Sequence, residues 1–97
     1  MVMAYVVKPN RCFDNAFTLK YKGSDTDTVE ANDSQLFTFY DDNITDSDVA
    51  VVTVQYIDGN TLDDIKTNHC ITDGALQVKV LNAGAADATV TVNVAVL

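Results

Sequence analysis

The chain has 97 residues, and 14 acidic residues against 6 basic ones give it a formal net charge of −8. A chain of this length has room for one hydrophobic core and little room for a deep active site, which favours binding or assembly over catalysis. The acidic balance excludes nucleic acid as an expected partner, because binding to phosphates requires clustered Lys and Arg.

The residue types point to β structure. Of the acids, 13 are Asp and only Glu30 is glutamate. Glu is a good helix former, whereas Asp competes for backbone hydrogen bonds and favours turns. Val and Thr are abundant, and their branched side chains suit a pleated sheet.

Period-two alternation and short apolar runs, bounded by Pro, Gly, Asn and Asp, predict six strands. In chain order these are Val2–Val7, Phe17–Lys22, Gln35–Tyr40, Val49–Ile57, Ala75–Leu81 and Ala88–Leu97.

Two intervening regions leave alternatives open. The run Gly23–Asp27 is expected to break the second strand, with Thr28–Ala31 a candidate seventh strand. Within Asn60–Asp73, the residues Leu62–Ile65 fit either one helical turn or the second arm of a hairpin at Asp58-Gly59.

Six or seven short strands predict an all-β fold, a small antiparallel β-sandwich that is immunoglobulin-like or a partly open barrel. No repeat or linker divides the chain, so residues 1–97 are expected to form a single β domain. The last strand, Ala88–Leu97, contains no charge. Edge strands are usually protected by charge, Pro or a bulge, so this strand should be central in its sheet or paired with a neighbouring molecule. We favour the central position.

Charge is unevenly distributed along the chain. Residues 1–22 carry four basic residues against Asp14 alone, whereas residues 23–97 carry two lysines against thirteen acids. One interpretation is random scatter of surface charge. The other is that residues 1–16 form an N-terminal docking arm, in which Lys8 and Arg11 bind an acidic partner.

The aromatic run Leu36–Tyr40 offers a second candidate contact. Phe37 and Phe39 share one face of the expected strand, and Leu36 and Tyr40 share the other. One face should line the core and the other could bind a partner. We assign the contact to Phe37 and Phe39.

No catalytic motif is present, and the protein is expected not to be an enzyme. The one histidine, His69, precedes Cys70, and in a strand the two side chains would point to opposite faces. The sequence has no G-x-S-x-G elbow and no phosphate-binding glycine motif. Glycosidase chemistry is also disfavoured, since the chain has no Trp to stack on a sugar.

No cofactor is expected, and calcium is the one cation worth considering. Hard cations need several oxygen ligands from a loop. If a site exists, it should be formed by Asp41, Asp42, Asp46 and Asp48. The EF-hand spacing is absent, and acidic turns are common without metal.

The cysteines and the N-terminal residues indicate in which cellular compartment the protein is expected. Cys12 and Cys70 lie too far apart for a CxxC motif and are expected to be free thiols. The first residues do not fit a secretory signal, and no apolar run reaches the roughly 20 residues of a membrane span. Synthesis in the cytosol and no membrane partner are expected.

One segment carries a resemblance to a known family. The segment Leu76–Gly84 followed by Ala88–Val92 reads as a closing hairpin, similar to the last two strands of many immunoglobulin-like modules. With its short length and strands rich in Val, Thr, Ala and Asn, the chain resembles the small β-sandwich decoration, or cement, proteins of tailed-phage capsids. The resemblance implies a non-enzymatic virion protein, made in the host cytoplasm, that binds capsid subunits.

The expected function is therefore assembly. The chain should bind subunits of a larger protein lattice, with the major capsid protein as the candidate partner, and should also self-associate through strand edges. The alternative is an adhesion or ligand-binding β-sandwich module that could depend on calcium.

Overall fold

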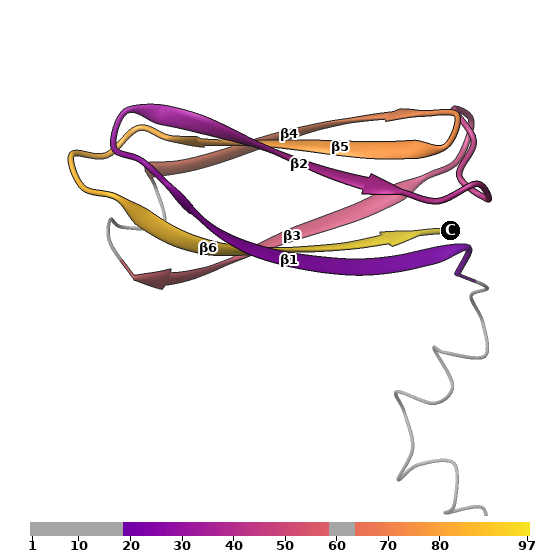
Figure 1. The fold of residues 1–97 in the computed structure, drawn as a ribbon, viewed down its shortest axis with the longest axis horizontal. Helices are drawn as coiled ribbons and strands as arrows, with labels where there is room; N and C mark the ends of the chain where they lie inside the picture. Colours follow the sequence, from indigo (N-terminus) through magenta and orange to yellow (C-terminus); the bar gives the residue numbers. More distant parts are fainter. Residues whose placement is uncertain (1–18, 59–63) are drawn as a thin grey trace, which may run out of the picture.

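The computed structural model describes residues 19–58 and 64–97. They form two three-stranded antiparallel sheets, stacked face to face (Figure 1). We name them sheet A, with strand order β1-β6-β3, and sheet B, with strand order β2-β5-β4. The strands are β1 (Tyr21–Val29), β2 (Asp33–Tyr40), β3 (Ala50–Asp58), β4 (Ile65–Thr72), β5 (Ala75–Asn82) and β6 (Ala88–Val96). This part of the chain contains no α-helix, and hence no helix able to span a membrane.

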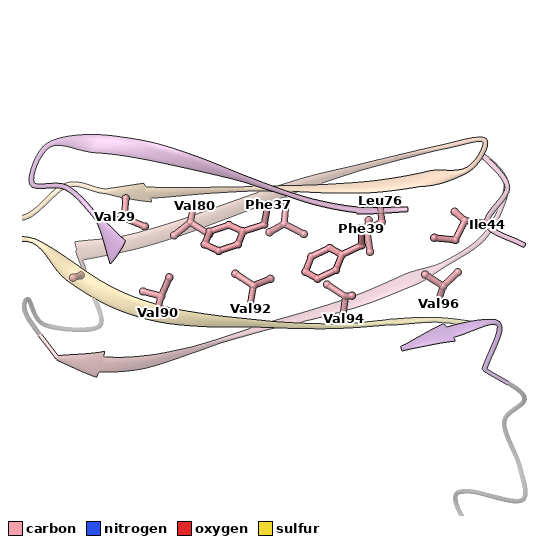
Figure 2. Close-up of a cluster of buried hydrophobic side chains, with 12 residues drawn as sticks. Val29, Phe37, Phe39, Ile44, Leu76, Val80, Val90, Val92, Val94 and Val96 are labelled. Carbon is pink, nitrogen blue, oxygen red and sulfur yellow. The ribbon is translucent and has the colours of Figure 1, made fainter. Parts of the chain in front are cut away.

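The all-β prediction is confirmed, and the core lies between the two sheets (Figure 2). Every second residue of β6 points inward, so its alternation matches the two-residue period of a strand. These valines meet apolar side chains of sheet B, mainly from β2 and β5. Deeply buried members of the two layers include Phe37, Leu76, Val78, Val80, Val90, Val92 and Val96. Each buried side chain of this size contributes about 1.5–3 kcal/mol from loss of apolar contact with water.

The last strand is central in its sheet, as predicted. β6 pairs with β1 on one side and with β3 on the other, both antiparallel. Both of its edges are therefore occupied, which explains how a strand without charge is tolerated in this sheet.

The predicted break at Gly23–Asp27 is wrong, because β1 runs through it from Tyr21 to Val29 in unbroken register with β6. The position of β1 at the edge of sheet A explains why the strand continues through these residues. β1 is an edge strand, so Asp25 and Asp27 can lie on its inward side and still be exposed to water. The separate strand predicted at Thr28–Ala31 is also wrong, since β1 includes Thr28 and ends at Val29. A tight turn follows, in which Asn32 adopts φ 57° and the Asp33 N–H donates to the Glu30 carbonyl at 3.1 Å.

The ambiguous region before residue 73 contains β4. It forms a hairpin with β5 through the turn Asp73-Gly74, where Gly74 adopts φ +85°, which suits glycine. The alternative of a hairpin between Val49–Ile57 and Leu62–Ile65 is wrong, because β3 and β4 belong to different sheets. Leu62 and Asp63 lie outside the described residues, as does the predicted strand Val2–Val7.

The predicted closing hairpin is also wrong. β5 lies in sheet B and β6 in sheet A, so between Asn82 and Ala88 the chain passes from one sheet to the other at one end of the sandwich instead of turning back within one sheet (Figure 1). The side chain of Asn82 stabilises this connection through hydrogen bonds to backbone groups. Its Nδ2 donates to the Val29 carbonyl at 3.0 Å and to the Ala86 carbonyl at 2.8 Å, and its Oδ1 accepts from the Gly84 N–H at 2.9 Å.

Candidate interaction surfaces

Among the described residues, the neighbours His69 and Cys70 do not form a catalytic dyad. His69 and Cys70 are successive residues of β4, paired with Val78 and Gln77 of β5, so their side chains lie on opposite faces as predicted. Both are exposed. Cys70 is a free thiol, while Cys12 lies in the segment that the structure does not describe.

In the loop between β2 and β3, predicted as the place for any cation, two of the four named carboxylates accept hydrogen bonds from the backbone of the loop itself. The Asp41 Oδ1 accepts from the Asn43 N–H at 2.8 Å, and the Asp48 Oδ2 accepts from the Thr45 N–H at 2.9 Å. Ile44, at the centre of the loop, is buried at one end of the core (Figure 2). No group of three or more His, Cys, Asp or Glu side chains gathers around a metal-sized space in residues 19–58 and 64–97. Asp41 and Asp48 thus act as turn acceptors in this loop.

Asp48 also forms the ion pair that joins this loop to the start of β1. The Lys20 Nζ lies 2.8 Å from the Asp48 Oδ1. The hydrogen bond from Lys20, followed by that from the Thr45 backbone, lowers the pKa of Asp48 below its usual 3.8. The carboxylate is therefore stabilised in its charged form.

The assignment of Phe37 and Phe39 as partner contacts is wrong, because both lie in the core (Figure 2). They point toward the valines of β6, and Phe39 also meets Tyr21 with ring centroids 6.3 Å apart. Leu36 and Tyr40 point the other way and are 53% and 76% exposed. The run does have one core face and one open face, but the two faces are exchanged relative to our assignment.

The open face of β2 is part of a larger surface, which we call the B face. It is the outer face of sheet B and is set by the register of β2, β5 and β4. Its residues are Ser34, Leu36, Thr38, Tyr40, Lys66, Asn68, Cys70, Thr72, Ala75, Gln77, Lys79 and Leu81. The set includes two lysines and no carboxylate, although the whole chain has a net charge of −8.

The B face is slightly hollowed at its centre. One shallow hollow of about 300 Å³ is lined by Leu81 with both lysines, Lys66 and Lys79. A second, of about 210 Å³, adjoins it and is lined by Leu36, Cys70 and Lys79 among others. Since Lys79 lines both hollows, cationic and apolar groups lie together in one contiguous area. The alternation Leu76–Leu81 places Lys79 opposite the core, but Lys66 joins it only once β4 pairs with β5.

The outer face of sheet A has a different chemistry, dominated by hydroxyl and amide side chains. The Thr26 and Thr91 hydroxyls share a hydrogen bond of 2.7 Å, and Ser24 Oγ donates to Asn93 Oδ1 at 3.0 Å. Asn93 Nδ2 in turn donates to Gln55 Oε1 at 3.4 Å, which joins all three strands. These side chains therefore form hydrogen bonds with one another across the sheet.

The predicted basic contacts Lys8 and Arg11 lie outside the described residues, as does the proposed docking arm 1–16. Of the predicted partner contacts, the structure therefore places only Phe37 and Phe39.

Comparison with protein-family models, with curated proteins and with solved structures found no match to this chain.

Proposed function

We propose that this protein is a non-enzymatic assembly protein that docks on a larger protein lattice through the B face. The observation that carries the proposal is the composition of that face. Leu36, Tyr40 and Leu81 are exposed there beside two lysines, and no carboxylate is present in a strongly acidic chain. Apolar surface of this kind, rimmed by polar groups, is typical of protein interaction sites.

The chemistry of the B face defines its partner. Leu36 and Leu81 would be buried against apolar side chains, whose removal from water supplies affinity. Lys66 and Lys79 would face carboxylates of the partner and favour one orientation of docking. The partner is thus a protein surface with an apolar centre and acidic groups beside it.

The class of lattice follows from the resemblance to tailed-phage decoration proteins. A decoration protein binds the outside of a shell built from many copies of a capsid protein, and a small β-sandwich with one adhesive face suits that role. We assign the protein to the virion on this basis, with the major capsid protein as the partner.

The test is co-sedimentation of the full-length protein with empty capsid shells that lack it, purified from the virus that encodes the chain. We expect saturable binding at a fixed ratio to the shell subunits. Leu81→Asp places a carboxylate in the hollow that Leu81 lines with Lys66 and Lys79, and it should weaken binding by about tenfold or more, because it removes apolar contact area and would meet the acidic groups of the partner.

The matched control is Thr28→Asp, which adds the same charge to an exposed position on the outer face of sheet A. It should leave binding within about twofold of the wild type. The proposal is wrong if the wild-type protein stays in the supernatant at every shell concentration, or if the two variants weaken binding equally.

A further inference from the structure

The four edge strands of the two sheets differ in how they are protected against pairing with another chain. β1 carries Lys22, Asp25 and Asp27, and β4 carries Lys66. β2 begins with Asp33 and is further shielded by β1, where Asp27 accepts a hydrogen bond from Gln35 at 3.2 Å. Charges of this kind are the usual defence of an exposed edge.

β3 has no such defence over most of its length. From Ala50 to Gln55 it contains no charge and no proline. A register irregularity lies between Tyr56 and Asp58, at its C-terminal end, and leaves the preceding residues in regular pairing with β6. Every second residue of an edge strand directs its backbone N–H and C=O away from the sheet, so β3 presents an uncharged pairing edge over Ala50–Gln55.

The contrast with β1 is clearest across the rows of sheet A. Ala95 of β6 lies between Lys22 of β1 and Val51 of β3, and Val51 is 50% exposed. At the equivalent place in the row, one edge of the sheet has a lysine and the other an exposed valine. The next row has Ser24 and Thr53 on either side of Asn93.

The occupant that we assign to the β3 edge is a second copy of this chain. The net charge of −8 opposes the approach of two copies in general, so the neutral stretch Ala50–Gln55 is the part of an edge strand where two copies meet with the least repulsion. A strand that pairs with its own copy about a two-fold axis must be antiparallel, so the two neutral stretches lie together and each end meets the opposite end.

We infer that the β3 edge is a self-association site, at which two copies of the chain pair β3 against β3 and join their A sheets into one six-stranded sheet. Val51 of each copy becomes covered by the partner's edge. The inference does not rest on the proposed function, because β3 belongs to sheet A and the B face to sheet B.

The experiment measures the association of the full-length protein by sedimentation equilibrium over a range of protein concentrations. The wild type should follow a monomer–dimer equilibrium. Thr53→Lys, at an exposed position, brings two like charges together across the two-fold axis and should weaken the dimer by about tenfold or more.

Ser24→Lys is the matched control, since Ser24 occupies the same row on the opposite edge and is also exposed. It should leave the dimer constant within about twofold. A second measurement needs no variant: hydrogen exchange of amides in Val51–Val54 should slow as the protein concentration rises, while exchange in β1 should not.

The inference is overturned if the wild type is a monomer at all concentrations, if Thr53→Lys and Ser24→Lys weaken the dimer equally, or if amide exchange in β3 is independent of concentration. A failure of Thr53→Lys to fold, seen as loss of the far-ultraviolet circular dichroism of the sheet, leaves the exchange measurement on the wild type to decide.

Discussion

Asn82 is a fully buried polar residue at the end of β5, and its side-chain amide is hydrogen-bonded through both its nitrogen and its oxygen. It links three backbone groups, two in the crossover to β6 and one at the end of β1. A buried backbone group that loses its partner costs about 1–3 kcal/mol. Asn82 therefore holds the chain where it passes from sheet B to sheet A.

We expect Asn82→Ala to lower the free energy of unfolding by about 3 kcal/mol, because two carbonyls and one N–H lose their Asn82 partner. Urea denaturation measures the change. Asn93→Ala is the control, since Asn93 makes its hydrogen bonds on the water-exposed face of sheet A and should cost about 1 kcal/mol or less. Equal losses for both variants would contradict this role of Asn82.

The ion pair between the Lys20 and Asp48 side chains makes the free energy of unfolding depend on pH. The pKa of Asp48 is lowered in the folded state, so folding favours its charged form. The resulting stability is present above the usual pKa of 3.8 and is lost as pH falls through the lower folded-state pKa.

Asp48→Asn removes this contribution. We expect its melting temperature to lie below that of the wild type above pH 3.8, and the difference to shrink as the pH falls further. Thermal unfolding of both proteins across this range is the measurement. In a Lys20→Met background the difference should be smaller, and a difference that does not change with pH would exclude the ion pair as its cause.

At the scale of elements, position within the sheet explains what each strand can contain. β6 is central and covered, so its inward face is entirely Val and Ala. β1 is an edge strand and contains Gly23, over which the ring of Tyr21 lies so closely that a Cβ there would be 2.5 Å from its hydroxyl. The absent side chain makes room for Tyr21 to pack against Phe39.

Replacing central and edge valines should therefore have unequal effects. Val92→Ala, in the middle of β6, leaves a cavity and should destabilise the protein by about 2–3 kcal/mol. Val51→Ala, on the exposed face of edge strand β3, should cost about 0.5 kcal/mol. Urea denaturation of dilute protein measures both, and a large loss at Val51 in the monomer would contradict the assignment.

At the scale of the whole molecule, the chain passes between the sheets repeatedly, and only β4 and β5 follow each other within one sheet. Sheet A is consequently assembled from strands far apart in sequence, and both β1 and β3 pair with β6. The sixth strand in chain order, β6, joins the other two strands of the sheet. Such non-local pairing implies slow folding, on the order of milliseconds to seconds.

A chain truncated after Asp87 should fail to fold, because β1 and β3 lose the strand that joins them and the core loses its inner layer of valines. Circular dichroism and NMR of the truncated chain are the measurement. Removal of Leu97 alone is the control and should leave the fold intact, since β6 ends at Val96. A folded truncated chain would contradict the central role of β6.

The sequence by itself determined the class of the fold, most strand positions in the described part of the chain, and the central place of β6. These follow from local alternation and from the absence of charge on one strand, which are properties of each segment alone.

Only the tertiary structure decided which strands share a sheet. Alternation is the same whether two strands pair side by side or face each other across the core, so the predicted hairpin of β5 and β6 was wrong. For the same reason, alternation alone does not determine which face of Leu36–Tyr40 is exposed. Phe37 and Phe39 are buried because they lie on the inward side of β2. Lys66 and Lys79 come together only through the pairing of β4 with β5.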